Sequence, residues 1–343
     1  MRELLNVLYV QTQGAVLHLD HDTVRVEVEG ETKLRAPLLR LEGIVVFGQV
    51  TVTPFLVHRC AEDGRSLVWL DRHGRFKARA EGEVGGNVLL RRAQHLALSD
   101  PVRPWAIARQ IVAGKVQNSR QVLLRGARES RTSADTLVLA AAAERLAECL
   151  GRARDSKDLT TLRGAEGEAA HVYFEVFERL VHAEREDFAF GGRTRRPPRD
   201  RLNAVLSFLY SLLRNECASA LEGVGLDPQV GYLHALRPGR PALALDLMEE
   251  LRPVIADRLA LTLVNRRQLK GSDFDEFPDG SFLLNEGGRK TVLVAYQKRK
   301  EEEVQHRVLK AKVPLGLVPH VQARLLARHL RNEIGHYPPF LYR

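Results

Sequence analysis

Cysteine is scarce in this sequence: the three that occur, Cys60, Cys149 and Cys217, lie far apart and form no CxxC pair. An odd number of widely spaced cysteines argues against a disulfide framework and against a structural zinc site. Such a chain suits a reducing compartment, and we expect a cytoplasmic protein. Long apolar runs are missing as well. The N-terminal MRELLNVLYVQTQG lacks the apolar segment of a signal peptide. No stretch approaches the ~18 apolar residues of a membrane span, so we expect no membrane association.

Acidic residues are outnumbered by basic ones. The 343 residues include 52 Lys and Arg against 43 Asp and Glu, which gives a net charge of +9. A folded protein this basic often binds a polyanion, although the excess can also serve solubility alone. The length suits two domains, and a hydrophobic content of 44% is enough to form a core.

The positive charge is concentrated in three segments. Arg103 to Arg131 contains seven Lys or Arg against one acid, and Gly191 to Arg201 contains five Arg against one Asp. The two prolines of the second segment predict a loop. Arg289 to Lys312 contains eight basic residues, offset in part by three glutamates. Such clusters bind the phosphates of nucleic acids in a salt-dependent way, but each one alone could equally be a solvated surface.

The first part of the chain, about 90 residues, is predicted to be rich in strands. Thr23 to Glu29 alternates apolar and polar residues, which is the period of a half-buried strand. Short apolar runs separated by turn residues predict further strands at Leu5–Val10, Gly43–Phe47 and Leu67–Leu70. A single helix is expected at Pro54–Ala61.

Helical periodicity dominates after the Gly85-Gly86 pair. Helices are expected at residues 133–150, 160–183, 200–221, 242–264 and 319–333. A β-hairpin is expected where Glu286-Gly287-Gly288 separates Ser281–Leu284 from Thr291–Tyr296. The chain is therefore predicted to have an α+β fold. A small β-rich N-terminal domain, residues 1–86, precedes a larger all-helical domain, residues 87–343, with a short β-hairpin insertion.

The segment from Leu226 to Pro253, LDPQVGYLHALRPGRPALALDLMEELRP, concentrates the candidate chemistry. His234 precedes a Pro/Gly turn, and the helix expected after the turn carries Asp246, Glu249 and Glu250. Offsets of three and four residues place these carboxylates on adjacent helical turns. Carboxylates this close repel one another unless a cation lies between them, and that cation is either a Lys or Arg side chain or a divalent metal ion.

A metal site is one interpretation of this segment. Mixed carboxylate and imidazole ligands suit Mn²⁺ or Mg²⁺ better than structural zinc. An ion held in this way can activate water or a hydroxyl and stabilise charge on a phosphoryl group. In the alternative interpretation, His234 is a hydrogen-bonded core residue and the acids pair with bases such as Arg252 and Arg258. Spacing alone does not exclude the alternative.

A third acid is needed for a metal site, and local spacing does not identify it. The segment LRGAEGEAA offers Glu166 and Glu168. Glu166 lies between Gly164 and Gly167, where backbone or substrate can approach closely, whereas Glu168 would point from a different helix face. Glu166 could also be a first-turn acid that the helix dipole favours.

Four segments resemble the CRISPR-associated endonuclease/integrase family Cas1, in a type I-C-like branch. They are LRGAEGEAAHVYF from Leu162, RRPPRDRLNAVLSFLYSLL from Arg195, LDPQVGYLHALRPGRPALALDLMEELRP from Leu226 and GRKTVLVAYQKRKEEEVQH from Gly288. The resemblance covers essentially the whole chain, and the third segment is the most distinctive. It implies a β-rich N-terminal domain, through which family members form a homodimer, and a helical catalytic domain. Both agree with the pattern described above.

The resemblance implies which residues bind metal. The Glu of the LRG-x-E-G motif corresponds to Glu166, and the His of the G-[FY]-[LI]-H motif corresponds to His234. The last acid of the D-x-x-[DE] pattern corresponds to Glu249, where some members have Asp, so the coordination geometry of the longer Glu stays open. Asp246 is then a catalytic residue in or beside the site, whereas Glu168 and Glu250 match no ligand position. The implied cofactor is Mn²⁺ or Mg²⁺.

The resemblance also implies the reaction and the partners. In CRISPR adaptation, the 3′-hydroxyl of a captured DNA fragment attacks a phosphodiester at the edge of a CRISPR repeat, and the small partner Cas2 completes the integration complex. Asn203 and Tyr210 lie on one expected helix and either line the DNA near the metal or pack the helix. The candidate DNA contacts are Arg195, Arg196, Arg199 and Lys290. Two alternatives from other classes are a stand-alone structure-specific nuclease of DNA repair and a non-catalytic DNA-binding scaffold.

Overall fold

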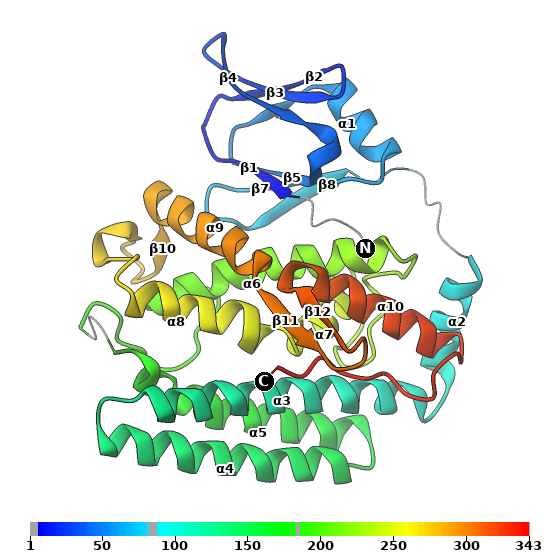
Figure 1. The fold of residues 1–343 in the computed structure, drawn as a ribbon, viewed down its shortest axis with the longest axis vertical. Coiled ribbons are helices and arrows are strands. Elements are labelled where there is room, and N and C mark those ends of the chain that lie inside the picture. The colour runs from blue at the N-terminus through cyan, green and yellow to red at the C-terminus, as the bar shows by residue number, and fades with distance from the viewer. Residues whose placement is uncertain (1–5, 81, 83–87, 183–185, 343) are drawn as a thin grey trace. The chain divides into compact units, whose positions relative to one another are not determined.

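The computed structural model describes residues 6–80, 82, 88–182 and 186–342. The chain divides into two compact units (Figure 1). The first contains Met1–Gly85 and Asn285–Gln297, and the second contains Gly86–Leu284 and Lys298–Arg343. The chain thus returns to the first unit well after residue 86, the predicted domain boundary, and residues 83–87 themselves lie outside the described residues. The assignment of dimerisation to the N-terminal part and of catalysis to the helical part stays a prediction.

The first unit is built mainly from strands. Its elements are β1 Asn6–Val10, β2 Val16–Asp20, β3 Thr23–Val28, β4 Glu31–Pro37, η1 Leu38–Arg40, β5 Leu41–Phe47, β6 Thr51–Val52, α1 Pro54–Glu62, β7 Ser66–Leu70 and β8 Phe76–Ala80. One four-stranded sheet has the order β1-β5-β7-β8, with β8 antiparallel to its neighbour. The other has the order β4-β3-β2-β6, and only β2 and β6 run parallel. The strands and the helix predicted in this part of the chain are therefore observed.

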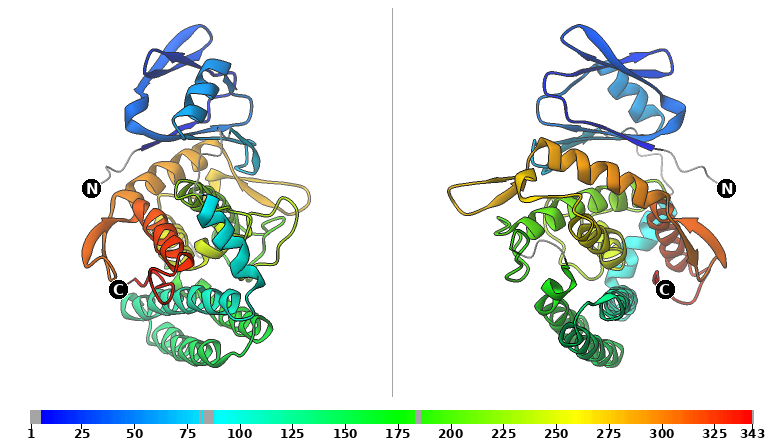
Figure 2. Two further views of the ribbon diagram at one scale, coloured as in Figure 1. Left: turned by 90° about the vertical axis from the view of Figure 1, so that its right-hand side faces the viewer. Right: turned by 60° about the vertical axis from the view of Figure 1, so that its left-hand side comes forward.

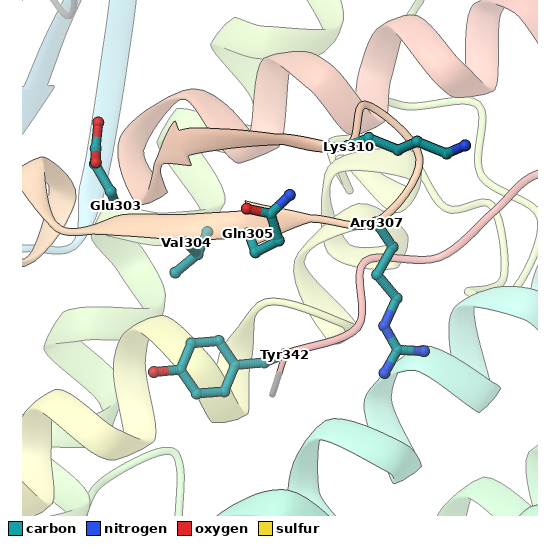
Figure 3. A pocket seen from close by; sticks show the side chains of 6 residues that line it. All are labelled: Glu303, Val304, Gln305, Arg307, Lys310 and Tyr342. Carbon is teal, nitrogen blue, oxygen red and sulfur yellow. The ribbon is translucent and has the colours of Figure 1, made fainter.

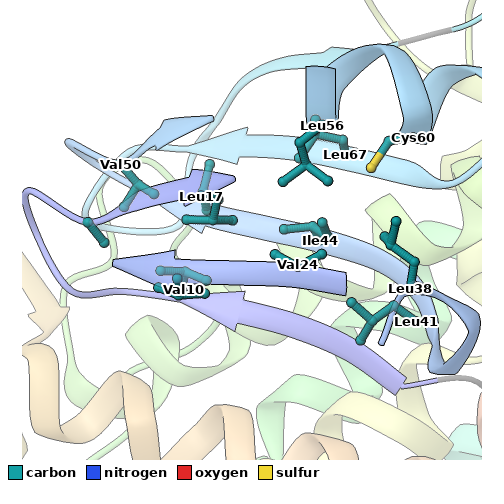
Figure 4. Packing of buried hydrophobic residues seen from close by; sticks show 13 residues of the cluster. Val10, Leu17, Val24, Leu38, Leu41, Ile44, Val50, Leu56, Cys60 and Leu67 are labelled. Atoms are coloured by element: carbon teal, nitrogen blue, oxygen red, sulfur yellow. The ribbon is translucent and has the colours of Figure 1, made fainter. Parts of the chain in front are cut away.

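An apolar core holds the first unit together (Figure 4). The alternation predicted for β3 is observed, because Val24 and Val26 are buried. The turn from β3 to β4 uses Glu29 and Gly30, both at positive φ (53° and 80°), as a type I′ hairpin requires. Core side chains come from five strands: Val10, Leu17, Val24, Ile44 and Leu67.

The second unit is mainly helical. Its helices are α2 Val88–Ser99, α3 Arg103–Glu129, α4 Ser133–Asp155, α5 Leu159–Glu175, η2 Phe177–Leu180, α6 Arg201–Glu222, α7 Ala242–Glu249, η3 Arg252–Asp257, α8 Arg258–Asn265, η4 Gly271–Asp273, η5 Leu315–Leu317 and α10 Val318–Leu330. Two small antiparallel sheets add β9 Phe274–Glu276 with β10 Phe282–Leu284, and β11 Glu303–His306 with β12 Ala311–Pro314. Helix α9, Glu286–Glu301, begins in the first unit and ends in the second.

Two groups of helices form the body of the second unit. Helices α3, α4 and α5 lie side by side (Figures 1 and 2), and α6 packs against α7, α8 and α10. Helix α3 also contacts α7, so it joins the two groups. Among the residues that the structure describes, no helix is long and apolar enough to cross a membrane.

The helix expected over residues 242–264 is interrupted. Helix α7 ends at Glu249, and Arg252–Asp257 form a π-helical segment before α8. The reason is Pro253, which has no N–H to donate to the carbonyl of Glu249. The apolar period continues through the break, which is why periodicity alone predicted one helix.

The hairpin expected around Glu286-Gly287-Gly288 is wrong in its placement. Thr291–Tyr296, expected to be a strand, lies within α9, and β10 pairs instead with β9. Asn285 caps α9, since its Oδ1 accepts a hydrogen bond from Gly288 N at 3.0 Å. Val292 and Tyr296, four residues apart, are both buried, so helical packing overrides the β-propensity of this segment.

Candidate metal centre

Asp246 organises the segment that carries His234. Its Oδ2 accepts hydrogen bonds from the backbone N–H groups of Tyr232 at 2.6 Å and Leu233 at 2.9 Å. Its Oδ1 accepts from His234 N at 3.0 Å and pairs with His234 Nδ1 at 2.7 Å. Asp246 is fully buried. Because both carboxylate oxygens are occupied by donors of this chain, we interpret Asp246 as a positioning residue behind the site.

Gly231 lets this loop reach helix α7. A Cβ at position 231 would lie 2.6 Å from the backbone carbonyl carbon of Ala242 and 2.8 Å from Asp246 Oδ2. Neither the helix backbone nor the carboxylate can give way without disturbing the hydrogen bonds just described. The glycine before the Tyr-Leu-His sequence is therefore required by close packing.

The contact with Asp246 orients the ring of His234. A carboxylate can only accept, so Nδ1 donates its proton in this pair, and Nε2 is the ring nitrogen left for another partner. Nε2 lies 3.7 Å from Glu249 Oε1. A carboxylate that fixes one ring nitrogen while the other faces a second acid is the arrangement common to metal-binding histidines.

Glu249 is the last residue of α7 and its side chain is 3% exposed. Arg252 NH1 lies 2.9 Å from its Oε1, and Lys115 Nζ lies 2.8 Å from its Oε2. Burial alone would raise the pKa of Glu249, but the charges of Arg252, Lys115 and His234 lower it to about 2. The acid is therefore ionised at neutral pH. The alternative, structural interpretation of the sequence predicted that these acids pair with bases such as Arg252, and the pair of Glu249 with Arg252 is observed.

Glu166 reaches the same cation from another helix. It lies on α5, and its Oε1 accepts a hydrogen bond from Lys115 Nζ, which comes from α3. The side chain of Glu166 is 25% exposed and that of Lys115 is 12% exposed. A Cβ added at Gly164 or Gly167 would meet nothing within 4 Å. The surface beside Glu166 is open, as expected for a place where substrate approaches.

The donor set fits a divalent cation. His234 Nε2 and the carboxylates of Glu166 and Glu249 are hard or borderline donors of the kind that Mn²⁺ and Mg²⁺ accept. Glu249 Oε2 is buried and receives no well-aligned hydrogen bond from any described residue, although Lys115 Nζ is near it. Among the described residues, no three His, Cys, Asp or Glu side chains already stand in a coordinating arrangement. The ammonium of Lys115 instead contacts both Glu166 and Glu249.

The two neighbouring acids have other roles. Glu168 is about half exposed and pairs with Arg152 NH2 at 2.8 Å. Glu250 is fully buried, where its carboxylate accepts from Gln322 Nε2 at 3.0 Å and Phe340 N at 2.8 Å and contacts Tyr337 OH. Burial raises the pKa of Glu250 to about 7. Glu250 thus ties the C-terminal segment to α7 and does not face His234.

The two candidates on α6 differ. Asn203 is buried in the first turn, where its Oδ1 accepts from Thr194 N at 3.0 Å and its Nδ2 donates to Gly192 O at 2.8 Å, so it shapes the arginine-rich loop. Tyr210 is closer to the site. Its ring lies 4.8 Å from the guanidinium carbon of Arg252, and its hydroxyl donates to Asp257 Oδ1 at 2.7 Å.

The candidate DNA contacts are exposed. Arg195, Arg196 and Arg199 lie in the loop before α6, and Lys290 lies on α9 in the first unit. Arg199 is held by the carbonyl of Asp279. None of the site residues predicted from the sequence lines a separate pocket of 390 Å³ (Figure 3). Its lining residues are Glu303, Val304, Gln305, Arg307, Lys310 and Tyr342.

Two residues at the site were missed by sequence reasoning. Lys115 is one of seven basic residues between Arg103 and Arg131, a segment that the sequence analysis described only as a positively charged cluster. Arg163 belongs to the LRG-x-E-G motif, and its Nε donates to Leu233 O at 2.8 Å, so it ties the helix of Glu166 to the loop of His234. Arg163 precedes Glu166 by three residues, and this helical spacing could have indicated that the two side chains lie on the same face of α5.

Comparisons with known proteins identify the family. The family described as CRISPR associated protein Cas1 matches residues 8–298. The chain is 59% identical to CRISPR-associated endonuclease Cas1 1 of Moorella thermoacetica and 51% identical to CRISPR-associated endonuclease Cas1 2 of Rhodospirillum rubrum, over the full length of both chains in each case. The chain belongs to the CRISPR-associated Cas1 family. It is accordingly a CRISPR-associated endonuclease, and the predicted endonuclease/integrase function in CRISPR adaptation is confirmed.

Solved structures confirm the fold class. A Cas1 protein of Thermotoga maritima superimposes with a TM-score of 0.81 at 26% identity, covering 95% of this chain and 97% of that one. A casposase bound to an integration product superimposes with a TM-score of 0.82 at 22% identity, covering 96% of this chain and 92% of that one, and shows the fold alone. The mixed fold with a strand-rich N-terminal part and a helical remainder is therefore confirmed. The type I-C-like branch and the roles of individual residues stay predictions.

Proposed function

We propose that this Cas1 chain cuts and joins DNA strands at one divalent metal ion held by Glu166, His234 and Glu249. The observation that carries the proposal is the alignment of His234 by Asp246, which presents Nε2 to Glu249. Mn²⁺ or Mg²⁺ bound there would supply activation of a hydroxyl and neutralisation of phosphoryl charge. The residues of this chain provide the rest of the chemistry by positioning and electrostatics.

The reaction we propose is transesterification. The 3′-hydroxyl oxygen of a DNA fragment forms a bond to phosphorus at the edge of a CRISPR repeat, and the bond from phosphorus to the leaving 3′ oxygen breaks. The attacking hydroxyl gives up its proton and the leaving oxygen gains one, so no oxidant or covalent protein intermediate is needed. With water in place of the hydroxyl, the same arrangement hydrolyses the strand.

The chain's own cations suit a phosphoryl group. Arg252 NH1 and Lys115 Nζ both lie within 3 Å of a carboxylate oxygen of Glu249. Arg252 is also fixed on the ring of Tyr210. A guanidinium held in place before the substrate arrives stabilises developing negative charge without reorganisation. We infer that Tyr210 acts through Arg252 and that Asn203 acts by shaping the loop of Arg195, Arg196 and Arg199.

The partners we propose are DNA, a second copy of the chain and Cas2. The net charge of +9 and the exposed arginines of the loop before α6 support DNA binding. Related folds are described as parts of Cas6-RT-Cas1–Cas2 complexes; one superimposes with a TM-score of 0.82 at 23% identity over 99% of this chain and 36% of that one. Dimerisation through the strand-rich unit and a type I-C-like system complete the proposal.

Strand joining tests this proposal. Purified protein with Mn²⁺, a 3′-hydroxyl duplex and a repeat-bearing plasmid should give joined products, with Cas2 added in a parallel reaction. Glu166→Ala and His234→Ala should abolish joining. Glu168→Ala is the matched control, because Glu168 lies two residues from Glu166 on the same helix but pairs with Arg152 instead. Loss of joining in Glu168→Ala, with Glu166→Ala still active, would overturn the ligand assignment.

The same reactions separate the alternatives. Cutting without joining, even with Cas2 present, would favour a structure-specific repair nuclease. Salt-sensitive DNA binding with neither cutting nor joining would leave a scaffold.

A further inference from the structure

Lys115 is a cation inside the candidate metal centre, in contact with two of the three proposed metal ligands. It lies on α3, whereas the proposed ligands come from α5, α7 and the loop before α7. Its Nζ contacts Glu166 Oε1 and lies 2.8 Å from Glu249 Oε2. One ammonium therefore binds the same two carboxylates that a metal ion would bind.

The charges of the site balance closely without a metal. Glu166 and Glu249 are each paired with a cation, and Lys115 and Arg252 supply the two positive charges. Asp246 adds one negative charge, which hydrogen bonds from backbone N–H groups and from His234 Nδ1 stabilise. A divalent cation added to this set leaves one net positive charge. A single phosphodiester would neutralise that charge.

We propose that Lys115 is an internal counter-cation of the metal-free site, that it leaves the carboxylates when a metal ion binds, and that it then contacts a DNA phosphate, so that metal and DNA bind cooperatively. The proposal rests on the proposed function, since it places the metal between Glu166 and Glu249. Lys115 keeps its charge throughout, and only the position of its side chain changes.

The packing of α3 allows this movement. Helix α3 packs closely at the neighbouring Gly114, because a Cβ there would lie 2.9 Å from Pro339 Cβ and 3.1 Å from Glu250 Cβ. A change in the position of the ammonium therefore falls to the lysine side chain, whose four-carbon stem is flexible. The side chain of Lys115 is 12% exposed and that of Glu166 is 25% exposed, so both reach the open side of the site.

Metal affinity measured without catalysis tests the proposal. Free Mn²⁺ is followed by electron paramagnetic resonance in the absence and presence of a 3′-hydroxyl duplex. Lys115→Met keeps the length of the side chain and removes the competing charge. Without DNA it should bind Mn²⁺ about tenfold more tightly than the wild type, equivalent to about 1.4 kcal/mol. DNA should tighten Mn²⁺ binding in the wild type and much less in Lys115→Met.

Two further variants act as controls. Lys300→Met removes a comparably buried lysine, paired with Glu216 Oε1 at 2.6 Å, and should leave Mn²⁺ affinity unchanged. Lys115→Arg keeps the charge and should bind Mn²⁺ no more tightly than the wild type. Circular dichroism checks whether Lys115→Met folds. If it does not, Lys115→Arg still tests the proposal, because tighter Mn²⁺ binding by a variant that keeps the charge would contradict competition by charge.

The outcomes separate this inference from the proposed function. Mn²⁺ binding that depends on Glu166 but is equal or weaker in Lys115→Met overturns the role of Lys115 alone. Absence of Glu166-dependent Mn²⁺ binding by the wild type, with and without DNA, overturns the metal centre and the role of Lys115 together.

Discussion

Asp246→Asn tests how the candidate centre is built. The carboxylate receives four hydrogen bonds, two on each oxygen, from Tyr232 N, Leu233 N, His234 N and His234 Nδ1. An amide has one oxygen, so in either orientation its NH₂ group faces two of these donors. Each buried donor that loses its acceptor costs about 1–3 kcal/mol. We therefore expect the free energy of unfolding to fall by about 2–6 kcal/mol, a large part of the roughly 5–15 kcal/mol of a typical domain.

The same substitution should weaken metal binding. His234 loses the partner that fixes its Nδ1–H, and removal of such a partner typically lowers metal affinity by about 10–100-fold. Urea unfolding measures the first effect, and Mn²⁺ titration measures the second. Asp135→Asn is the control, because Asp135 is a buried acid on α4 that pairs with Arg179 of η2, and neither element carries a proposed metal ligand. It should lose stability and keep its Mn²⁺ affinity. Wild-type stability and Mn²⁺ affinity in Asp246→Asn would refute the positioning role.

Two further predictions concern packing and pH. Gly231→Ala should lower the free energy of unfolding by about 1–3 kcal/mol, because its Cβ would lie 2.6 Å from a backbone carbon of Ala242. Gly167→Ala, inside α5 with open space around it, should be neutral or raise stability by up to about 1 kcal/mol in the same urea assay, and the opposite order would contradict the packing. Burial raises the pKa of Asp257 to about 6. The native state therefore holds a proton that the unfolded chain releases, and the free energy of unfolding should fall by about 3 kcal/mol as the pH rises from about 4 to 6. Asp257→Asn should remove that part of the pH dependence, measured by urea unfolding across this range, and an unchanged slope would exclude Asp257 as its source.

Local patterns brought His234 together with Asp246, Glu249 and Glu250 as candidates, and the family resemblance then singled out Glu249 as the ligand. His234, Asp246 and Glu249 lie in one segment, where a Pro/Gly turn and helical spacing bring them together. The choice between Glu166 and Glu168 needed the family resemblance, since both lie on the same short motif. In the structure the two side chains do diverge: Glu166 contacts Lys115, and Glu168 pairs with Arg152.

Other features depend on contacts between distant segments. Lys115 lies 51 residues before Glu166, and nothing in the sequence pattern of its own helix marks it out from the five other basic residues there. Only the packing of α3 against α5 and α7 brings it between two acids. Thr291–Tyr296 shows the same limit for secondary structure, because a β-branched sequence becomes helical where buried side chains four residues apart favour it.

The break after Glu249 is stabilised rather than merely tolerated. Pro253 removes a helical hydrogen bond, and the π-helical segment that follows frees further carbonyl groups. Asn118 Nδ2 donates to Glu250 O at 2.7 Å, and Arg299 NH2 donates to Val254 O at 2.8 Å. Side chains from α3 and α9 thus satisfy the broken turn, and buried carbonyl groups that keep their partners avoid the cost of desolvation. The end of α7 is fixed by residues far away in the sequence. Since Glu249 is its last residue, the position of the proposed ligand depends on those contacts as much as on the motif that predicted it.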